Sequence, residues 1–217
     1  MVRVGDAIHL RRSQVKVDRG GQYGEIGVRS FGRGIFHKEP ISGAKLGNKR
    51  VFWIEPGDLV LSNVFAWEGA IAVAGDGERG KIGSHRFMTY VADPEVAQVE
   101  YLCHYFLSDH GLPLIQNASP GGAGRNRTLG IDAFENLEIP LPSAFEQRRI
   151  SEILGIADDA VKSAECLIDK LNRQHEGLLR ALVEKGHAFA TVGEIVSEPP
   201  RRLIQARNFC RDIGVLK

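Results

Sequence analysis

The longest regular pattern in the chain is a heptad repeat of apolar positions within residues 143–186. These positions alternate at spacings of four and three residues, which is typical of a coiled-coil seam. At about 1.5 Å per residue the predicted helix is roughly 60 Å long. A domain of ordinary size cannot cover a seam of that length, so we expect a partner helix from another chain. The seam is predicted to consist of Ile150, Leu154, Val161, Ile168, Leu171, Leu178 and Leu182, with Ala157 and Ala164 between them and the polar His175 in one slot.

The start and end of this helix also have sequence signals. Ser143 is a plausible N-cap, and Glu146 follows it at the spacing of a capping box. Gly186 is expected to end the helix. A proline-punctuated strand, Leu137–Pro142, is predicted directly before it, and Cys166 is expected to pack on the helix.

A different pattern occupies residues 1–142, where short apolar runs alternate with glycine turns. The runs 51–54, 59–61 and 87–91 are separated by Pro-Gly and Asp-Gly dipeptides, which favour turns between strands. A short helix is predicted at 101–107, closed by Gly111 and Pro113. The expected fold class is α+β: a mixed α/β domain rich in short strands at 1–142, one long coiled-coil helix at 143–186, and a tail at 187–217 with no assignment.

Composition narrows the class of protein without identifying it. The 217 residues are 43% apolar and 25% charged, which supports one core with an appendage or two small domains. There is no apolar run long enough to cross a membrane, and the N-terminus does not resemble a signal peptide. Three scattered cysteines favour reduced thiols and a cytoplasmic protein.

The charge distribution is more informative than the net charge of +1. Residues 1–50 hold 11 Lys and Arg against 4 Asp and Glu, whereas residues 51–100 hold 3 against 8. A chance excess on a solvated surface would explain the surplus of Lys and Arg in residues 1–50. A basic face that binds phosphate would explain it as well, and this second reading agrees with the loops described next.

Catalytic and metal-binding motifs are not found. The histidines and cysteines lack zinc spacing, and the glycine-rich segment 121–124 lacks the Lys-Ser/Thr of a phosphate-binding loop. We therefore predict no catalytic residue, no metal and no cofactor. A nuclease with a degenerate site remains an alternative, and its only candidate carboxylates are Asp58, Asp76 and Glu78.

Four polar loops carry side chains suited to reading DNA. Arg and Lys pair with guanine edges, Asn pairs with adenine, and all three contact phosphate. Each loop alone is more simply an exposed turn, but four in one domain favour DNA binding. Phe31 and Trp67 could be stacking or wedge groups, although core packing is the favoured role for Trp67. The predicted contact residues are Arg29, Arg33, Lys45, Asn48, Lys49, Arg86, Arg125 and Arg127.

Several segments of the chain resemble the target recognition domains of specificity subunits from type I restriction–modification systems. They are the segments 27–36, 54–62, 65–71 and 84–87. The junction Ile139-Pro-Leu-Pro-Ser-Ala-Phe-Glu-Gln-Arg-Arg-Ile150 is similar to that family's entry into its long conserved-region helix. The resemblance covers about residues 1–186 and leaves the tail unplaced.

The resemblance implies a non-catalytic subunit that reads half of a bipartite site in double-stranded DNA. It also implies docking to methyltransferase (M) subunits, with a restriction (R) subunit as a further partner. Typical members carry two recognition domains and two long helices, whereas this chain has one of each. We therefore expect an antiparallel homodimer through the helix, with His175 as a candidate for fixing register. A coiled-coil scaffold with a protein-binding head is the other alternative.

Overall fold

The structure is a computed structural model that describes residues 1–121 and 127–185, with side chains up to residue 181. It divides into two compact units, Met1–Asp158 and Asp159–Lys217. The strand-rich part of the chain and the first turns of the long helix belong to the first unit. The predicted α+β class, with short strands followed by one long helix, is confirmed.

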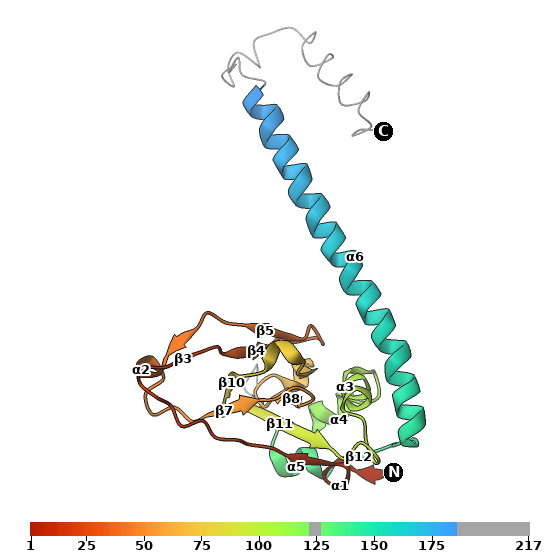
Figure 1. Ribbon diagram of the computed structural model, residues 1–217. Helices are drawn as coiled ribbons and strands as arrows, with labels where there is room; N and C mark the ends of the chain where they lie inside the picture. Colours follow the sequence, from red (N-terminus) through yellow and green to blue (C-terminus); the bar gives the residue numbers. More distant parts are fainter. Residues whose placement is uncertain (122–126, 186–217) are drawn as a thin grey trace. The chain divides into compact units, whose positions relative to one another are not determined.

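A four-stranded antiparallel sheet forms the centre of the first unit (Figure 1), in the order β2-β11-β8-β9. All four residues of β8 are buried, and Val60 of β8 lies opposite Thr89 of β11. A strand that is covered on both faces requires a continuous apolar run, and the Leu-Val-Leu sequence of β8 meets that requirement. The strands are β2 (Ile8–Leu10), β8 (Leu59–Ser62), β9 (Ile71–Val73) and β11 (Phe87–Ala92).

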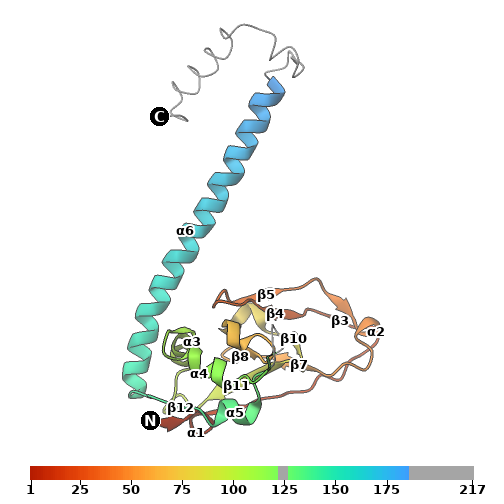
Figure 2. The same cartoon turned by 180° about the vertical axis from the view of Figure 1, so that it is seen from behind.

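Short helices pack on this sheet and complete the main core. Tyr90 of β11, Phe106 and Phe134 are fully buried, and the Phe106 and Phe134 ring centroids lie 5.2 Å apart in a tilted arrangement that aromatic pairs favour. Figure 2 shows α1 and α5 near the N-terminus, and α3 and α4 side by side beyond them. These helices are α1 (Val4–Ala7), α3 (Val99–Leu107), α4 (Leu112–Asn117) and α5 (Ile131–Glu135).

Smaller strand pairs extend the domain away from α3 and α4, toward the short helix α2 (Gly43–Leu46) (Figures 1 and 2). A second apolar cluster, which includes Ile26, Ile54 and Val60, joins two of these pairs to the central sheet. Those two are β4 (Ile26–Val28) with β5 (Ile35–His37), and β7 (Val51–Ile54) with β10 (Lys81–Ser84); the third is β3 (Gln22–Tyr23) with β6 (Ile41–Ser42). A separate pair, β1 (Val2–Arg3) with β12 (Glu138–Ile139), lies near the N-terminus (Figure 1).

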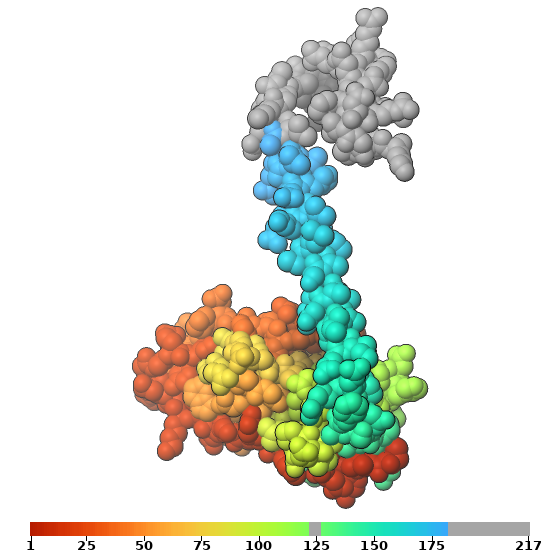
Figure 3. Space-filling view, turned by 45° about the vertical axis from the view of Figure 1, so that its right-hand side comes forward, coloured from red at the N-terminus to blue at the C-terminus, as the bar shows by residue number. Residues whose placement is uncertain are grey.

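Two 3-10 turns, η1 (Ala66–Glu68) and η2 (Asp76–Glu78), follow β8 and β9 in the chain. Figure 3 shows the orange region around β3–β5 and the yellow region around η2 on one face of the domain. A hydrogen bond joins them, with His37 Nε2 and Glu78 Oε1 2.6 Å apart. The β4–β5 hairpin is therefore tied to the body of the domain at its β5 side.

The long helix α6 spans Ala144–Lys185, and it begins with the predicted capping box. The Ser143 N–H donates to Glu146 Oε2 at 3.0 Å, and the Glu146 N–H donates back to Ser143 Oγ at 3.3 Å. Hydrogen bonds from the Ser143 hydroxyl and N–H to this carboxylate hold the pKa of Glu146 below its usual value.

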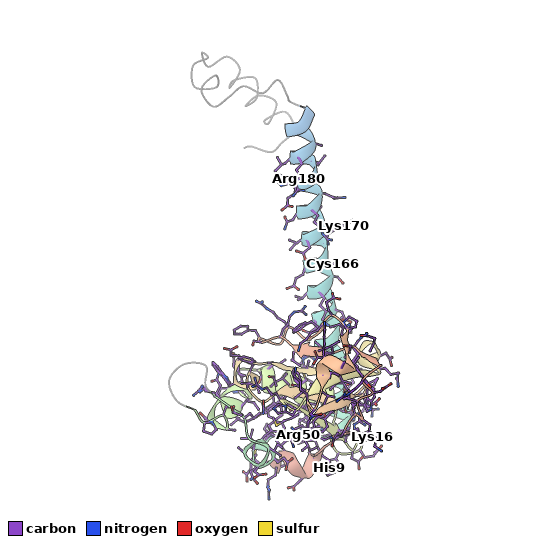
Figure 4. The ribbon with its side chains drawn as sticks, turned by 90° about the vertical axis from the view of Figure 1, so that its left-hand side faces the viewer. His9, Lys16, Arg50, Cys166, Lys170 and Arg180 are labelled. Carbon is purple, nitrogen blue, oxygen red and sulfur yellow. The ribbon has the colours of Figure 1, made fainter. Side chains whose placement is uncertain are left out.

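The predicted seam positions whose side chains are described are between 38% and 65% exposed. Leu182 lies outside the described side chains. Cys166 is also exposed, so its expected packing on the helix is wrong for the single chain; Figure 4 shows its side chain, with those of Lys170 and Arg180, projecting from α6. A long helix with a row of exposed apolar side chains has the properties of an unpaired interaction surface.

Two predictions of local structure are wrong. Gly111 and Pro113 do not simply close a helix, because Gly111 is the N-cap of α4 and Pro113 lies in its first turn, where a missing N–H costs nothing. The strand expected at residues 137–142 is confined to Glu138–Ile139, which pair with β1.

Candidate nucleic-acid interface

A surface cavity of about 690 Å³ lies where β4, β5, β8 and the turn after β10 meet. Its volume is in the range of small-molecule and nucleotide sites. The charged side chains that line it are four cations and a single carboxylate, Glu25. The cations are Lys38, Lys49, Arg50 and Arg86.

Two turns bring most of these cations to the cavity. Residues 47–50 connect α2 to β7, and Gly47 has a φ of 57°, a conformation that side-chain-bearing residues rarely adopt. Residues 85–86 connect β10 to β11, and the Asn63 N–H donates to the Arg86 carbonyl at 2.9 Å. The Arg12 guanidinium donates to the His85 carbonyl at 3.2 Å. The 85–86 turn is thus held by hydrogen bonds to its carbonyls, and the 47–50 turn by one from the Lys49 N–H to the Leu46 carbonyl at 3.2 Å, while the cationic side chains of both turns stay exposed.

Aromatic rings supply the apolar wall of the cavity. Phe36, Phe65 and Phe87 all line it. The Arg29 guanidinium lies 4.9 Å from the centroid of the Phe36 ring, within cation–π distance, so Arg29 sits beside the cavity without lining it. Apolar walls with a cationic rim are suited to a ligand that has both flat rings and phosphate groups.

Arg127 is held over Trp67, next to the same region. The Arg127 guanidinium lies 5.4 Å from the Trp67 ring centroid, and the indole N–H donates to the carbonyl of Val64, a cavity residue, at 3.0 Å. Trp67 is only partly buried. Its ring lies beneath an arginine, so the favoured prediction of core packing does not describe the whole environment of Trp67.

The structure brings part of the predicted contact set together. Asn48, Lys49 and Arg86 line one cavity, and Arg29 and Arg127 each stack on an aromatic ring at or next to it. Two other predicted residues do not line the cavity, because Arg33 lies at a hairpin tip and Lys45 is exposed on α2. Arg125 is outside the described residues.

Three further basic residues at the cavity were not among the predicted contacts: Lys38, Arg50 and His85. Arg50 and His85 are next to the predicted Lys49 and Arg86 in the sequence. Lys38 had no such signal, because its position depends on strand pairing: its N–H donates to the Glu25 carbonyl at 2.9 Å, which places it across from the start of β4.

The carboxylates of the nuclease alternative are each engaged locally. Asp58 is buried, pairs with Arg11 and accepts the Glu55 N–H at 2.9 Å; burial raises its pKa against the opposing effect of these partners. Asp76 pairs with Arg79 at 2.8 Å, and Glu78 pairs with His37. Within residues 1–121 and 127–181, no cluster of three or more acidic, histidine or cysteine side chains could hold a metal. Likewise, none of the helices that can be described has the length and hydrophobicity needed to span a membrane.

Solved structures share this architecture of a strand-rich domain and a long helix. The crystal structure of the HsdS subunit from Thermoanaerobacter tengcongensis matches with a TM-score of 0.61 and 22% identity, over 88% of this chain and 50% of that chain. A second structure concerns the structural basis of complex assembly and conformational transition of the type I R-M system. It matches with a TM-score of 0.60 and 23% identity, over 88% of this chain and 50% of that chain. The chain thus spans about half the length of the solved structures it matches.

Among curated proteins, the type I restriction enzyme MjaVIII specificity subunit of Methanocaldococcus jannaschii is 38% identical over 53 residues, which are 24% of this chain and 12% of that protein. No protein-family model matches the chain. The predicted resemblance is confirmed: the chain has the fold of HsdS specificity subunits from type I restriction–modification systems.

Proposed function

We propose that this chain is a non-catalytic DNA-recognition subunit that reads one half of a bipartite site for a type I restriction–modification complex. The observation that carries the proposal is the cavity that gathers Asn48, Lys49 and Arg86 on a domain with the HsdS fold. Cations in fixed turns bind phosphate, and an asparagine beside them supplies the donor and acceptor pair that adenine requires.

The long helix supports the second part of the proposal, which is assembly into an antiparallel homodimer. The seam side chains are exposed along most of α6, and burial of each leucine or isoleucine on pairing would contribute about 1.5–3 kcal/mol. A two-fold dimer would present two identical domains, so the site it reads would be two-fold symmetric and interrupted.

The third part concerns partners. In this proposal the methyl-transfer chemistry belongs to methyltransferase subunits that dock on the helical region, and a restriction subunit joins the same complex. The local engagement of Asp58, Asp76 and Glu78 supports a chain that carries no nuclease centre of its own. The limits of the recognition domain (1–142) and of the helix (143–186) remain predictions within this proposal.

The proposal is tested by selection from a pool of duplexes with a random central segment, using the purified chain. Enrichment of one sequence is expected. A variant with Asn48→Ala, Lys49→Gln and Arg86→Gln should enrich none, whereas Lys170→Gln, on α6, should enrich the same sequence as the wild type. If the wild-type chain, with methyltransferase subunits present, enriches no sequence, the proposal is wrong and the scaffold alternative is favoured.

A further inference from the structure

The tip of the β4–β5 hairpin presents an aromatic side chain to solvent in a strained backbone conformation. Phe31 is 71% exposed, and its φ of 63° makes it the one non-glycine residue with positive φ among the described residues. A bulky residue is strained in this conformation, and the conformation persists only where its surroundings enforce it. A glycine would meet the backbone requirement without strain, so the phenyl ring itself needs another explanation.

The surroundings do enforce this conformation. The Phe31 N–H donates to the Glu68 carbonyl at 2.8 Å, and the Gly32 N–H donates to the Gly69 carbonyl at 2.9 Å. The Ser30 hydroxyl donates to the Glu68 carboxylate at 2.9 Å. The tip is thus fastened to η1 by the backbone N–H groups of Phe31 and Gly32 and by the Ser30 hydroxyl, while the Phe31 side chain stays exposed.

Close packing beneath the tip leaves little freedom for it to shift. A Cβ at Gly32 would come within 3.0 Å of Leu107, and one at Gly69 would come within 3.2 Å of Leu107 and 3.5 Å of the Phe31 backbone. The two glycines let the hairpin tip sit directly on η1 and α3. An exposed ring on so rigid a base is positioned before any ligand arrives, which lowers the entropic cost of binding.

One guanidinium group lies beside the ring, and a second belongs to the same turn. Arg33 lies 5.9 Å from the Phe31 ring centroid, and Arg29, on the other side of the turn, is stacked on Phe36 at the cavity. The Arg29 N–H donates to the Gly34 carbonyl at 3.0 Å, which closes the turn. An exposed apolar ring on a turn that also carries two arginines fits a duplex, where phosphates flank the base pairs on either side.

We propose that Phe31 is a wedge that inserts between two adjacent base pairs of bound duplex DNA and unstacks them. This inference rests on the proposed function and adds a mode of readout to it. Arg29 and Arg33 bind the phosphates that flank the opened step. Because the energy of unstacking depends on the step, the wedge makes the domain sensitive to bases that it does not hydrogen-bond.

The test uses Phe31→Asn, because asparagine tolerates positive φ and lacks the apolar ring. Duplexes recovered by the random-site selection carry 2-aminopurine at successive positions, since its fluorescence rises when the base unstacks. The wild-type chain should raise the fluorescence several-fold at one step of each half-site and leave the other positions unchanged. Phe31→Asn should abolish the rise and weaken binding by about 10-fold, the loss expected for one intercalated aromatic side chain, without changing the salt dependence.

Arg33→Gln is the matched control. It should keep the fluorescence rise, while the slope of log K against log salt should fall by about 0.9, as expected for one lost phosphate contact. Phe31→Gly, which also relieves the positive-φ strain, gives the same readout should the asparagine variant fail to fold.

The possible outcomes distinguish a failure of the wedge proposal from a failure of the proposed DNA-recognition function. Two results would contradict the wedge and leave the recognition function standing. In the first, the wild-type chain binds a selected duplex but raises the 2-aminopurine fluorescence at no position. In the second, Phe31→Asn raises the fluorescence as much as the wild type does. If Phe31→Asn lowers only the capture of methyltransferase subunits, Phe31 is a protein contact and the wedge is again wrong. If the wild-type chain selects no DNA, both proposals fail.

Discussion

The side chain of Gln147, in the second turn of α6, accepts a hydrogen bond from the backbone N–H of Gln98 at 2.9 Å. The same side-chain amide donates to the carbonyls of Val96 at 3.0 Å and Pro142 at 2.8 Å. The Gln147 side chain itself is fully buried, so these three hydrogen bonds satisfy its amide within the protein. The glutamine of the Glu-Gln junction therefore anchors the first turns of the helix to the segment before α3.

Replacing Gln147 with Leu should destabilise the domain. The change keeps a similar volume but leaves two carbonyls and one N–H without partners, each a loss of about 1–3 kcal/mol when buried. Because part of this loss is relieved by local relaxation, we expect the free energy of unfolding to fall by about 2–4 kcal/mol in urea titrations. Arg148→Gln, at the exposed neighbouring position, should change it by less than about 0.5 kcal/mol; equal effects of the two changes would contradict the anchoring role.

Lys49 at the cavity should contribute to DNA affinity through charge. In the proposed function, Lys49→Gln removes one phosphate contact, so the slope of log K against log salt should fall by about 0.9. Fluorescence anisotropy with a selected duplex at several salt concentrations measures this slope. Lys170→Gln on α6 provides the control with an unchanged slope. A slope that Lys49→Gln leaves intact would place the DNA elsewhere on the domain.

Ile168 lies at the middle of the predicted seam and is 56% exposed. If the seam pairs as proposed, Ile168→Asp puts a charge into a buried interface, which costs several kcal/mol and should convert the dimer to a monomer at micromolar concentration. Sedimentation equilibrium measures the change. Lys170→Ala, two residues along the helix and off the seam, should remain dimeric. A wild-type chain that sediments as a stable monomer would contradict the pairing itself.

The capping box at Ser143 and Glu146 predicts a pH dependence. The folded-state pKa of Glu146 is lowered by its hydrogen bonds from Ser143, so the ionised form supplies stability. That contribution is complete above the ordinary value of 4.5 and is lost as the pH falls through the lowered pKa. The melting temperature of the wild type should exceed that of Glu146→Gln near neutral pH, and the difference should shrink in acid. A difference that is constant with pH would contradict the account.

The long helix was the part of the fold most accessible from sequence, because its signals are local. The heptad spacing depends only on neighbouring turns, and the bonds between Ser143 and Glu146 span three residues. The strand order β2-β11-β8-β9 could not be predicted in the same way, since pairing joins segments that are far apart in the chain. Pro113 was misread because proline signals both the end of one helix and the first turn of the next.

In the candidate site too, residues with a local sequence signal were predicted, whereas residues placed by contacts between distant segments were missed. Asn48, Lys49 and Arg86 were predicted from polar turns, whose exposure follows from local composition. Lys38 was missed because it reaches the cavity only through the pairing of β4 with β5. The role of Trp67 as a platform was missed for a similar reason, since Arg127 approaches it from a segment sixty residues away.

The symmetry of the selected DNA tests the central claim most directly. Random-site selection with the wild-type chain is expected to enrich two inverted copies of one short sequence, separated by a spacer of constant length. Ile168→Asp, which removes the dimer, should enrich a single copy with lower affinity. Enrichment by the wild type of one asymmetric sequence, or of paired copies at random spacing, would contradict a homodimer that reads two half-sites through one fixed helical spacer.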